Sequence, residues 1–196
     1  MLKRSLNNMA NENDTNPALR LYLSDLASLD KHILEALVRQ DEDERVKNDP
    51  EASKLVRESR QLFERFSTEL HEQCERVGTP IAKAVKESVT GVLGVAAGLY
   101  DKVRKDPVSR MLRDDYVAFN LAAISYNMMH TTGLAVHDQP VADIAKRHLE
   151  ELTKVIMEIN QIMPHIVVRE LQDEPGIDSS VAHEAVQHTQ EVWKPK

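Results

Sequence analysis

The sequence predicts an all-α domain, a four-helix bundle made of two antiparallel helical hairpins. Three observations predict it. The chain has 196 residues, of which only 4% are aromatic and 6 are Gly, which disfavours a β-sandwich or barrel. Four long stretches repeat apolar residues every three or four positions, as one face of a helix does. Three of these stretches open with Asn-Pro or Asp-Pro, a common helix start. A length of 196 residues fits one domain.

The charge and cysteine content exclude several classes of protein. Lys and Arg number 25 against 32 Asp and Glu, so the net charge is −7, which argues against a nucleic-acid partner. A single cysteine excludes an internal disulfide framework. Lys3 and Arg4 are followed by no apolar run of signal-peptide type, and no stretch reaches the ~20 apolar residues of a membrane span. We therefore expect a cytoplasmic protein without a membrane span.

The first helix is expected over residues 17–40. Residues 1–16 are polar and Asn-rich, which predicts a disordered N-terminus. Asn16 then caps the helix and Pro17 occupies its first position. The apolar stripe that follows is Leu19, Tyr22, Leu26, Leu29, Ile33 and Leu37. The charged run 41–49 predicts a solvated turn.

The second helix is expected over residues 50–77, in the same style. Asp49 caps it, and Gly78 begins the signal that stops it. Because the connection between the first two helices is short, they should form an antiparallel hairpin. Residues 79–106 contain three glycines in a weakly patterned apolar stretch, so we predict a long, partly helical crossover between the hairpins.

The second hairpin is expected to comprise helices over residues 107–136 and 140–170. Asp106 and Pro107 repeat the capped start, and Pro164 should kink or end the last helix. Residues 172–196 are predicted to be a flexible tail containing a short possible helix. The bundle domain is thus residues 17–171.

Several segments resemble the ferritin-like four-helix-bundle superfamily. They are residues 21–37, which are similar to its first helix, and residues 108–120, 124–130 and 141–152, which are similar to its third and fourth. The nearest similarity is to an uncharacterised bacterial branch associated with stress responses. The resemblance implies a ferritin-like antiparallel bundle, in which two hairpins are joined by a long crossover.

The metal motif of di-iron ferritin-like proteins is missing from this sequence. Those proteins supply Glu-x-x-His from each of two helices. Three residues before His71, His130 and His148 stand Thr68, Asn127 and Ala145, so none completes the motif. The first-helix position that resembles a ligand carries the shorter acid Asp30. We therefore expect no intact di-iron centre.

Two histidines nevertheless form a candidate metal site. His130 and His148 lie nine residues before and after Gln139, where the last hairpin turns, and both fall on predicted core stripes. Glu151 follows His148 by three residues. Two imidazoles and a carboxylate could hold Zn, Mn or Fe, with Asp30 as a further candidate ligand. The alternative is that each histidine makes a hydrogen bond in the core without metal, to Tyr126, Thr131 or a carboxylate.

Three functions stay open at this stage. The first, which we favour, is a ferritin-like bundle with a structural, interaction or stress-related role, working as a homodimer through apolar helix faces and not as an enzyme. The second is a divergent metal-binding or oxidoreductase bundle that uses His130 and His148. The third is a lipid- or granule-surface protein that uses residues 81–103. The sequence names no small-molecule substrate, and we assign no catalytic or cofactor-binding residue.

Overall fold

The structure is a computed structural model that describes residues 16–79 and 107–194. These two ranges form helices and no strand, which confirms the all-α prediction for the described part of the chain. The helices are α1 (Pro17–Asp41), α2 (Glu44–Lys47), α3 (Pro50–Arg76), α6 (Val108–Ala135), α7 (Gln139–Leu171) and α8 (Val181–Val192). The predicted N-terminal disorder and crossover fall on residues outside these ranges.

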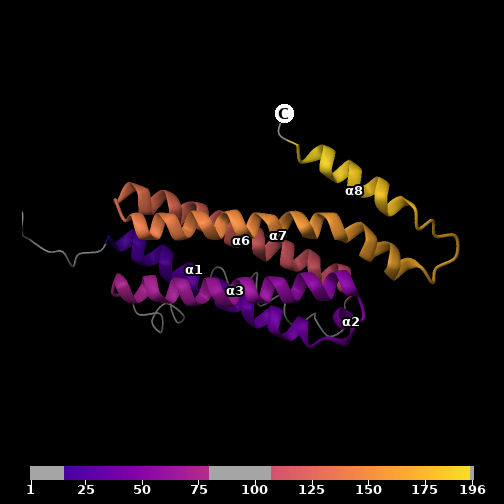
Figure 1. The fold of residues 1–196 in the computed structure, drawn as a ribbon, viewed down its shortest axis with the longest axis horizontal. Helices are drawn as coiled ribbons and strands as arrows, with labels where there is room; N and C mark the ends of the chain where they lie inside the picture. The colour runs from indigo at the N-terminus through magenta and orange to yellow at the C-terminus, as the bar shows by residue number, and fades with distance from the viewer. Residues whose placement is uncertain (1–15, 80–106, 195–196) are drawn as a thin grey trace, which may run out of the picture.

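Four long helices pack side by side (Figure 1). α1 contacts α3 and α6, and α7 contacts α3 and α6, so the order around the bundle is α1, α3, α7, α6. Asp30 and Gln40 of α1 bond Tyr126 and Asp115 of α6, in reversed order along the chain, so these two helices are antiparallel. The ion pairs between α3 and α7 run in reversed order as well. Each helix is therefore antiparallel to both of its neighbours.

The interior is filled by one side of each long helix, as the apolar spacing predicts. Aliphatic residues dominate, with an aromatic cluster at mid-bundle. The Phe63 ring lies 5.6 Å from that of Phe66 and 5.2 Å from that of Phe119, between centroids. The core thus joins α3 to α6 across the middle of the bundle.

The helix starts follow local capping chemistry. The side chains of Asn16, Asp49 and Asp138 accept hydrogen bonds from backbone N–H groups in the first turns of α1, α3 and α7. The predicted cap Asp106 lies outside the described residues. The structure has Pro107 at this cap position, and the Glu170 carboxylate of α7 accepts the Ser109 N–H.

Two local predictions need correction. The charged run 41–49 is not only a turn, because it contains α2, which Asp43 caps and which buries Val46 in the core. Of the two outcomes expected at Pro164, an end of the fourth helix is wrong, since α7 continues to Leu171. A proline inside a helix removes one backbone hydrogen bond, and the packing of α7 against α3 and α6 sustains the helix through it.

Beside the turn that joins them, the backbones of α6 and α7 approach each other unusually closely. A Cβ placed on Gly133 would lie 2.8 Å from the backbone nitrogen of Ala142, so only glycine permits this approach. His137 takes a left-handed backbone conformation (φ 61°) in the turn. The Asp138 N–H bonds the Gly133 carbonyl at 2.8 Å, which closes the end of α6. This approach fixes the level at which α6 and α7 side chains meet.

Candidate functional site

Polar side chains from all four long helices meet in the middle of the core. Asp30 comes from α1, Glu69 from α3, Tyr126 from α6 and His148 from α7. Asp30, Tyr126 and His148 are completely buried. Each sits on the inward stripe of its helix, among Leu, Ile and Phe side chains. We call these four residues the polar core.

Asp30 and Tyr126 form the first half of the polar core. The Tyr126 hydroxyl donates a hydrogen bond to Asp30 Oδ2. Burial raises the pKa of Asp30 to about 8, although the Tyr126 hydrogen bond acts in the opposite direction. Burial, together with the nearby Asp30 carboxyl, raises the pKa of Tyr126 as well. At neutral pH both groups are therefore protonated, and this half carries no charge.

His148 and Glu69 form the second half. His148 Nε2 lies 2.9 Å from Glu69 Oε2, and the imidazole stacks on the Phe66 ring with centroids 3.8 Å apart. Burial lowers the pKa of His148 to about 4, so the ring is neutral at pH 7. A neutral ring facing a carboxylate oxygen carries its proton on Nε2 and donates it to Glu69.

Glu69 links this half to the surface. Partial burial raises the pKa of Glu69, but hydrogen bonds from His148 and Arg147 outweigh it and hold the pKa below its usual value. Glu69 is thus ionised and shared between a buried imidazole and the exposed Arg147 guanidinium. The edge of the Tyr126 ring meets the His148 ring at 5.1 Å, so the two halves touch through aromatic packing.

The structure does not bring His130 and His148 to one level. The turn spans Val136–Asp138, so its centre is His137 and not Gln139. His130 is then 7 residues before the centre and His148 is 11 after it, a difference of about one helical turn. Tyr126, 11 residues before the centre, is the residue that meets His148. The expectation that the two histidines face each other is wrong.

The other predicted ligands find separate partners. His130 is half-buried and its Nδ1 lies 2.8 Å from the Ala142 carbonyl oxygen. Glu151 accepts a hydrogen bond from Arg65 on α3. Within residues 16–79 and 107–194, no three His, Cys, Asp or Glu side chains converge as a metal site requires. Binding of Zn, Mn or Fe by His130, His148, Glu151 or Asp30 stays a prediction.

Two buried atoms of the polar core are unsatisfied. Asp30 Oδ1 and His148 Nδ1 make no hydrogen bond within the described part of the chain. In the protonation states deduced above, His148 Nδ1 is an acceptor, whereas Asp30 Oδ1 is a donor because it carries the proton while Oδ2 accepts from Tyr126. The four groups of the polar core resemble acid–base machinery in type, but Asp30, Tyr126 and His148 are completely buried, which keeps a substrate away from them. The arrangement therefore suits a specific, hydrogen-bonded core better than a reaction centre.

Sequence reasoning missed Glu69 and the stacking partner Phe66. Glu151 was the expected carboxylate because it lies one turn from His148 on the same helix. Glu69 is on α3, and finding it requires the register of α3 against α7, for which the sequence carries no local signal. A carboxylate for His148 was foreseen as one alternative, and the structure supplies it from another helix.

Comparisons of the chain with protein-family models, curated proteins and solved structures found no match. No helix in the described ranges is long and apolar enough to cross a membrane.

Proposed function

We propose that this protein is a ferritin-like bundle that works as an interaction module, and that its partner is a second copy of itself. One observation carries the proposal: the outer face of α6 is uncharged and exposes four large apolar side chains. Residues 116–136 contain no Asp, Glu, Lys or Arg, in a chain that is 29% charged. A long uncharged stretch on a surface helix is typical of a contact surface.

The exposed residues of this face lie along one side of α6. Val117, Ile124, Met128 and Leu134 are 45 to 53% exposed although they are large and apolar. Val117, Ile124 and Met128 are spaced by seven and four residues, which places them on one line opposite the buried stripe that contains Tyr126, and Leu134 lies at the edge of this face. We call these four residues the α6 outer face. α6 thus presents large apolar side chains to solvent as well as to the core, beside the exposed polar residues Asn127 and Thr131, and a monomer does not need those exposed apolar side chains.

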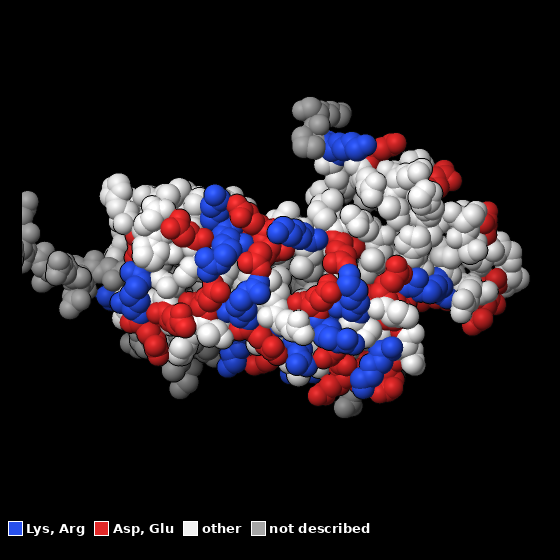
Figure 2. All heavy atoms as spheres, viewed as in Figure 1, with Lys and Arg blue, Asp and Glu red and all other residues white. Residues whose placement is uncertain are grey.

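Charge favours a second copy as the occupant. Figure 2 shows Lys and Arg mixed with Asp and Glu over α3 and α7. Two copies of a chain with net charge −7 repel each other. They meet at least cost where neither presents a charge, and a two-fold axis brings the same patch of both copies together. The α6 outer face carries no charge, and a two-fold axis can place it against the same face of a second copy.

The order of the helices supports the ferritin-like part of the proposal. α1 pairs with α3 and α6 with α7, and α3 ends at the opposite end of the bundle from the start of α6. The stress-related role remains part of the proposal. The lipid- or granule-surface alternative rests on residues 81–103, which lie outside the described residues.

The test is the mass of the protein in solution by light scattering after size-exclusion chromatography. We expect twice the chain mass of 22.2 kDa for the wild type. Ile124→Glu and Met128→Glu should each halve that mass without loss of helical circular dichroism, because both positions face solvent. Val38→Glu is the matched control, since Val38 is an exposed apolar residue on α1. The proposal would be contradicted if the wild type stayed monomeric at high concentration, or if the Ile124→Glu variant kept the mass of a dimer.

A further inference from the structure

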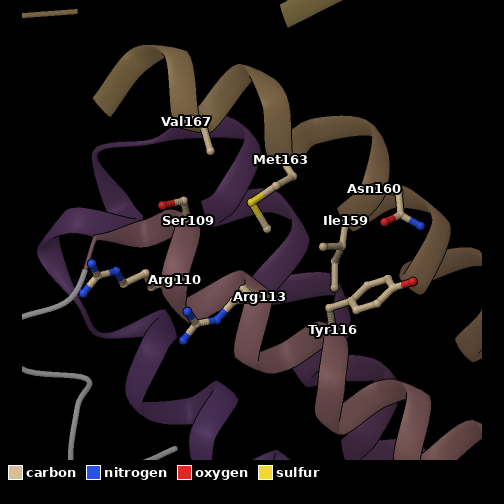
Figure 3. A pocket seen from close by; sticks show the side chains of 8 residues that line it. All are labelled: Ser109, Arg110, Arg113, Tyr116, Ile159, Asn160, Met163 and Val167. Carbon is tan, nitrogen blue, oxygen red and sulfur yellow. The ribbon is translucent and has the colours of Figure 1, made fainter. Parts of the chain in front are cut away.

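A cavity of about 380 Å³ lies between the first turns of α6 and the second half of α7 (Figure 3). Ile159, Met163 and Val167 of α7 form one wall, and Tyr116 of α6 closes one end. These side chains make the lining mainly apolar. Its volume falls in the range of pockets for small molecules.

Two arginines lie at the other end of the cavity. Arg110 and Arg113 are one turn apart on α6, and both line the cavity at the end away from Tyr116 (Figure 3). Arg113 engages Asp114 through Nε and Nη2, and a guanidinium has further N–H donors for an incoming anion. The planar fork of a guanidinium matches a carboxylate.

From this combination we propose that the cavity binds an amphipathic carboxylate, a molecule with an unbranched apolar chain and one anionic head. The chain lies along Ile159, Met163 and Val167. The head lies at Arg110 and Arg113. The Ser109 N–H and hydroxyl already donate to the Glu170 carboxylate, so in this proposal guanidinium N–H groups bind the head.

α8 connects the cavity to a spectroscopic signal. It folds back along α7, and the Trp193 ring meets the Tyr116 ring edge-on, with centroids 6.4 Å apart. Trp193 is the only tryptophan of the chain. A ligand that displaces Tyr116 or α8 must change the surroundings of Trp193 and therefore its fluorescence.

The experiment is a titration of the full-length protein with decanoate below its micelle concentration, followed by calorimetry and by Trp193 emission. We expect saturable one-to-one binding and a change in emission. Arg110→Gln and Arg113→Gln should each weaken decanoate at least tenfold and leave 1-decanol, which lacks the charge, unchanged. Val167→Phe should weaken the binding of both decanoate and 1-decanol, because the phenyl ring fills part of the cavity. Val167 is exposed enough for the fold to tolerate the larger side chain.

Arg57→Gln is the matched control, an exposed arginine on α3 outside the cavity, and it should bind decanoate as the wild type does. Ile124→Glu should also bind normally, which separates this proposal from self-association. No saturable binding to the wild type, or equal binding by Arg113→Gln, would overturn the proposal. Binding to phosphatidylglycerol vesicles without binding to decanoate would overturn it too, by assigning the arginines to a membrane surface.

Discussion

The bundle is held along two opposite seams that use polar groups in different ways. Along the α3–α7 seam, oppositely charged side chains pair at the surface: Asp49 and Glu51 with Arg169, Lys54 with Glu158, Arg65 with Glu151, Glu69 with Arg147, and Arg76 with Asp138. Along the α1–α6 seam, hydrogen bonds lie inside the protein, from Tyr126 to Asp30 and from Gln40 to Asp115.

The difference follows from access to water. Charged side chains at the surface stay solvated when they pair, so pairing requires little desolvation and each pair contributes little to stability. Inside the core, burial favours the protonated form of a carboxyl group, because it raises the pKa of Asp30 to about 8 and that of Asp115 to about 7. The contribution of the α1–α6 seam to stability should therefore depend on pH, whereas the contribution of the α3–α7 seam should depend on salt concentration.

The largest expected effect is the pH dependence of the α1–α6 seam. Asp30 has a folded-state pKa of about 8 against an unfolded value near 3.8, so its stabilising contribution is complete below pH 4 and is lost as pH rises to 8. Asp30→Asn cannot ionise. We expect the stability of the wild type relative to this variant to fall by on the order of 5 kcal/mol between pH 4 and 9. Urea unfolding at several pH values measures it.

The same substitution at Asp143, an exposed residue of α7, is the control and should leave the shape of the wild-type pH profile unchanged. In Asp30→Asn the new side chain would keep an acceptor for Tyr126 but bury an unpaired amide, so the variant should be the less stable protein at pH 4. A constant difference between wild type and Asp30→Asn across this range would show that the α1–α6 seam does not titrate.

Removing the Tyr126 hydroxyl, the hydrogen-bond donor on the α1–α6 seam, should have a smaller effect on stability. Tyr126→Phe removes the hydroxyl that bonds Asp30 and leaves Oδ2 unsatisfied, which should cost about 2 kcal/mol at pH 5. Because that hydrogen bond lowers the folded-state pKa of Asp30, the variant should still begin to lose stability near pH 4, but the loss should continue to a higher pH than in the wild type. Tyr116→Phe, on the same helix and half-buried, is the control and should change neither quantity.

The two seams also show what the sequence can predict. The four long helices follow from apolar spacing and from caps such as Asn16 and Asp49, which are local features. The pair of Tyr126 with Asp30 joins residues 96 positions apart, and the pair of His148 with Glu69 joins residues 79 apart. Such contacts depend on the register of one helix against another, which the spacing of apolar residues within a single helix does not predict.

The position of the turn between α6 and α7 determines which core residues meet. Centring the last hairpin on Gln139 pairs His130 with His148. The observed centre at His137 shifts the pairing by one turn and puts Tyr126 against His148. Gly133 sets this register through its approach to Ala142. The residue types of the core were therefore predictable, but their partners were not.

On the α3–α7 seam we expect the largest effect at Asp49, which has two tasks. Its carboxylate caps α3 by accepting the Ala52 N–H at 3.0 Å, and it accepts from Arg169 Nε at 2.9 Å. Asp49→Ala removes both and should cost about 2 kcal/mol. Asp49→Asn retains the cap and should cost about 1 kcal/mol or less. Thermal unfolding at pH 7 gives both values, and equal losses for the two variants would mean that the cap contributes nothing.

The smallest expected effect is at Lys54, in the middle of the same seam. Lys54 Nζ lies 3.2 Å from Glu158 Oε1, but the lysine side chain is 62% exposed. Water competes for both groups, and ordering a long side chain offsets the attraction. We expect Lys54→Met to unfold at the wild-type temperature, in low salt and in about 1 M NaCl, while the difference between Asp49→Asn and the wild type shrinks with salt because the Arg169 pair is screened. A loss at Lys54 as large as that of Asp49→Asn would show that the surface pairs act as one network, and the two seams would then differ in chemistry but not in strength.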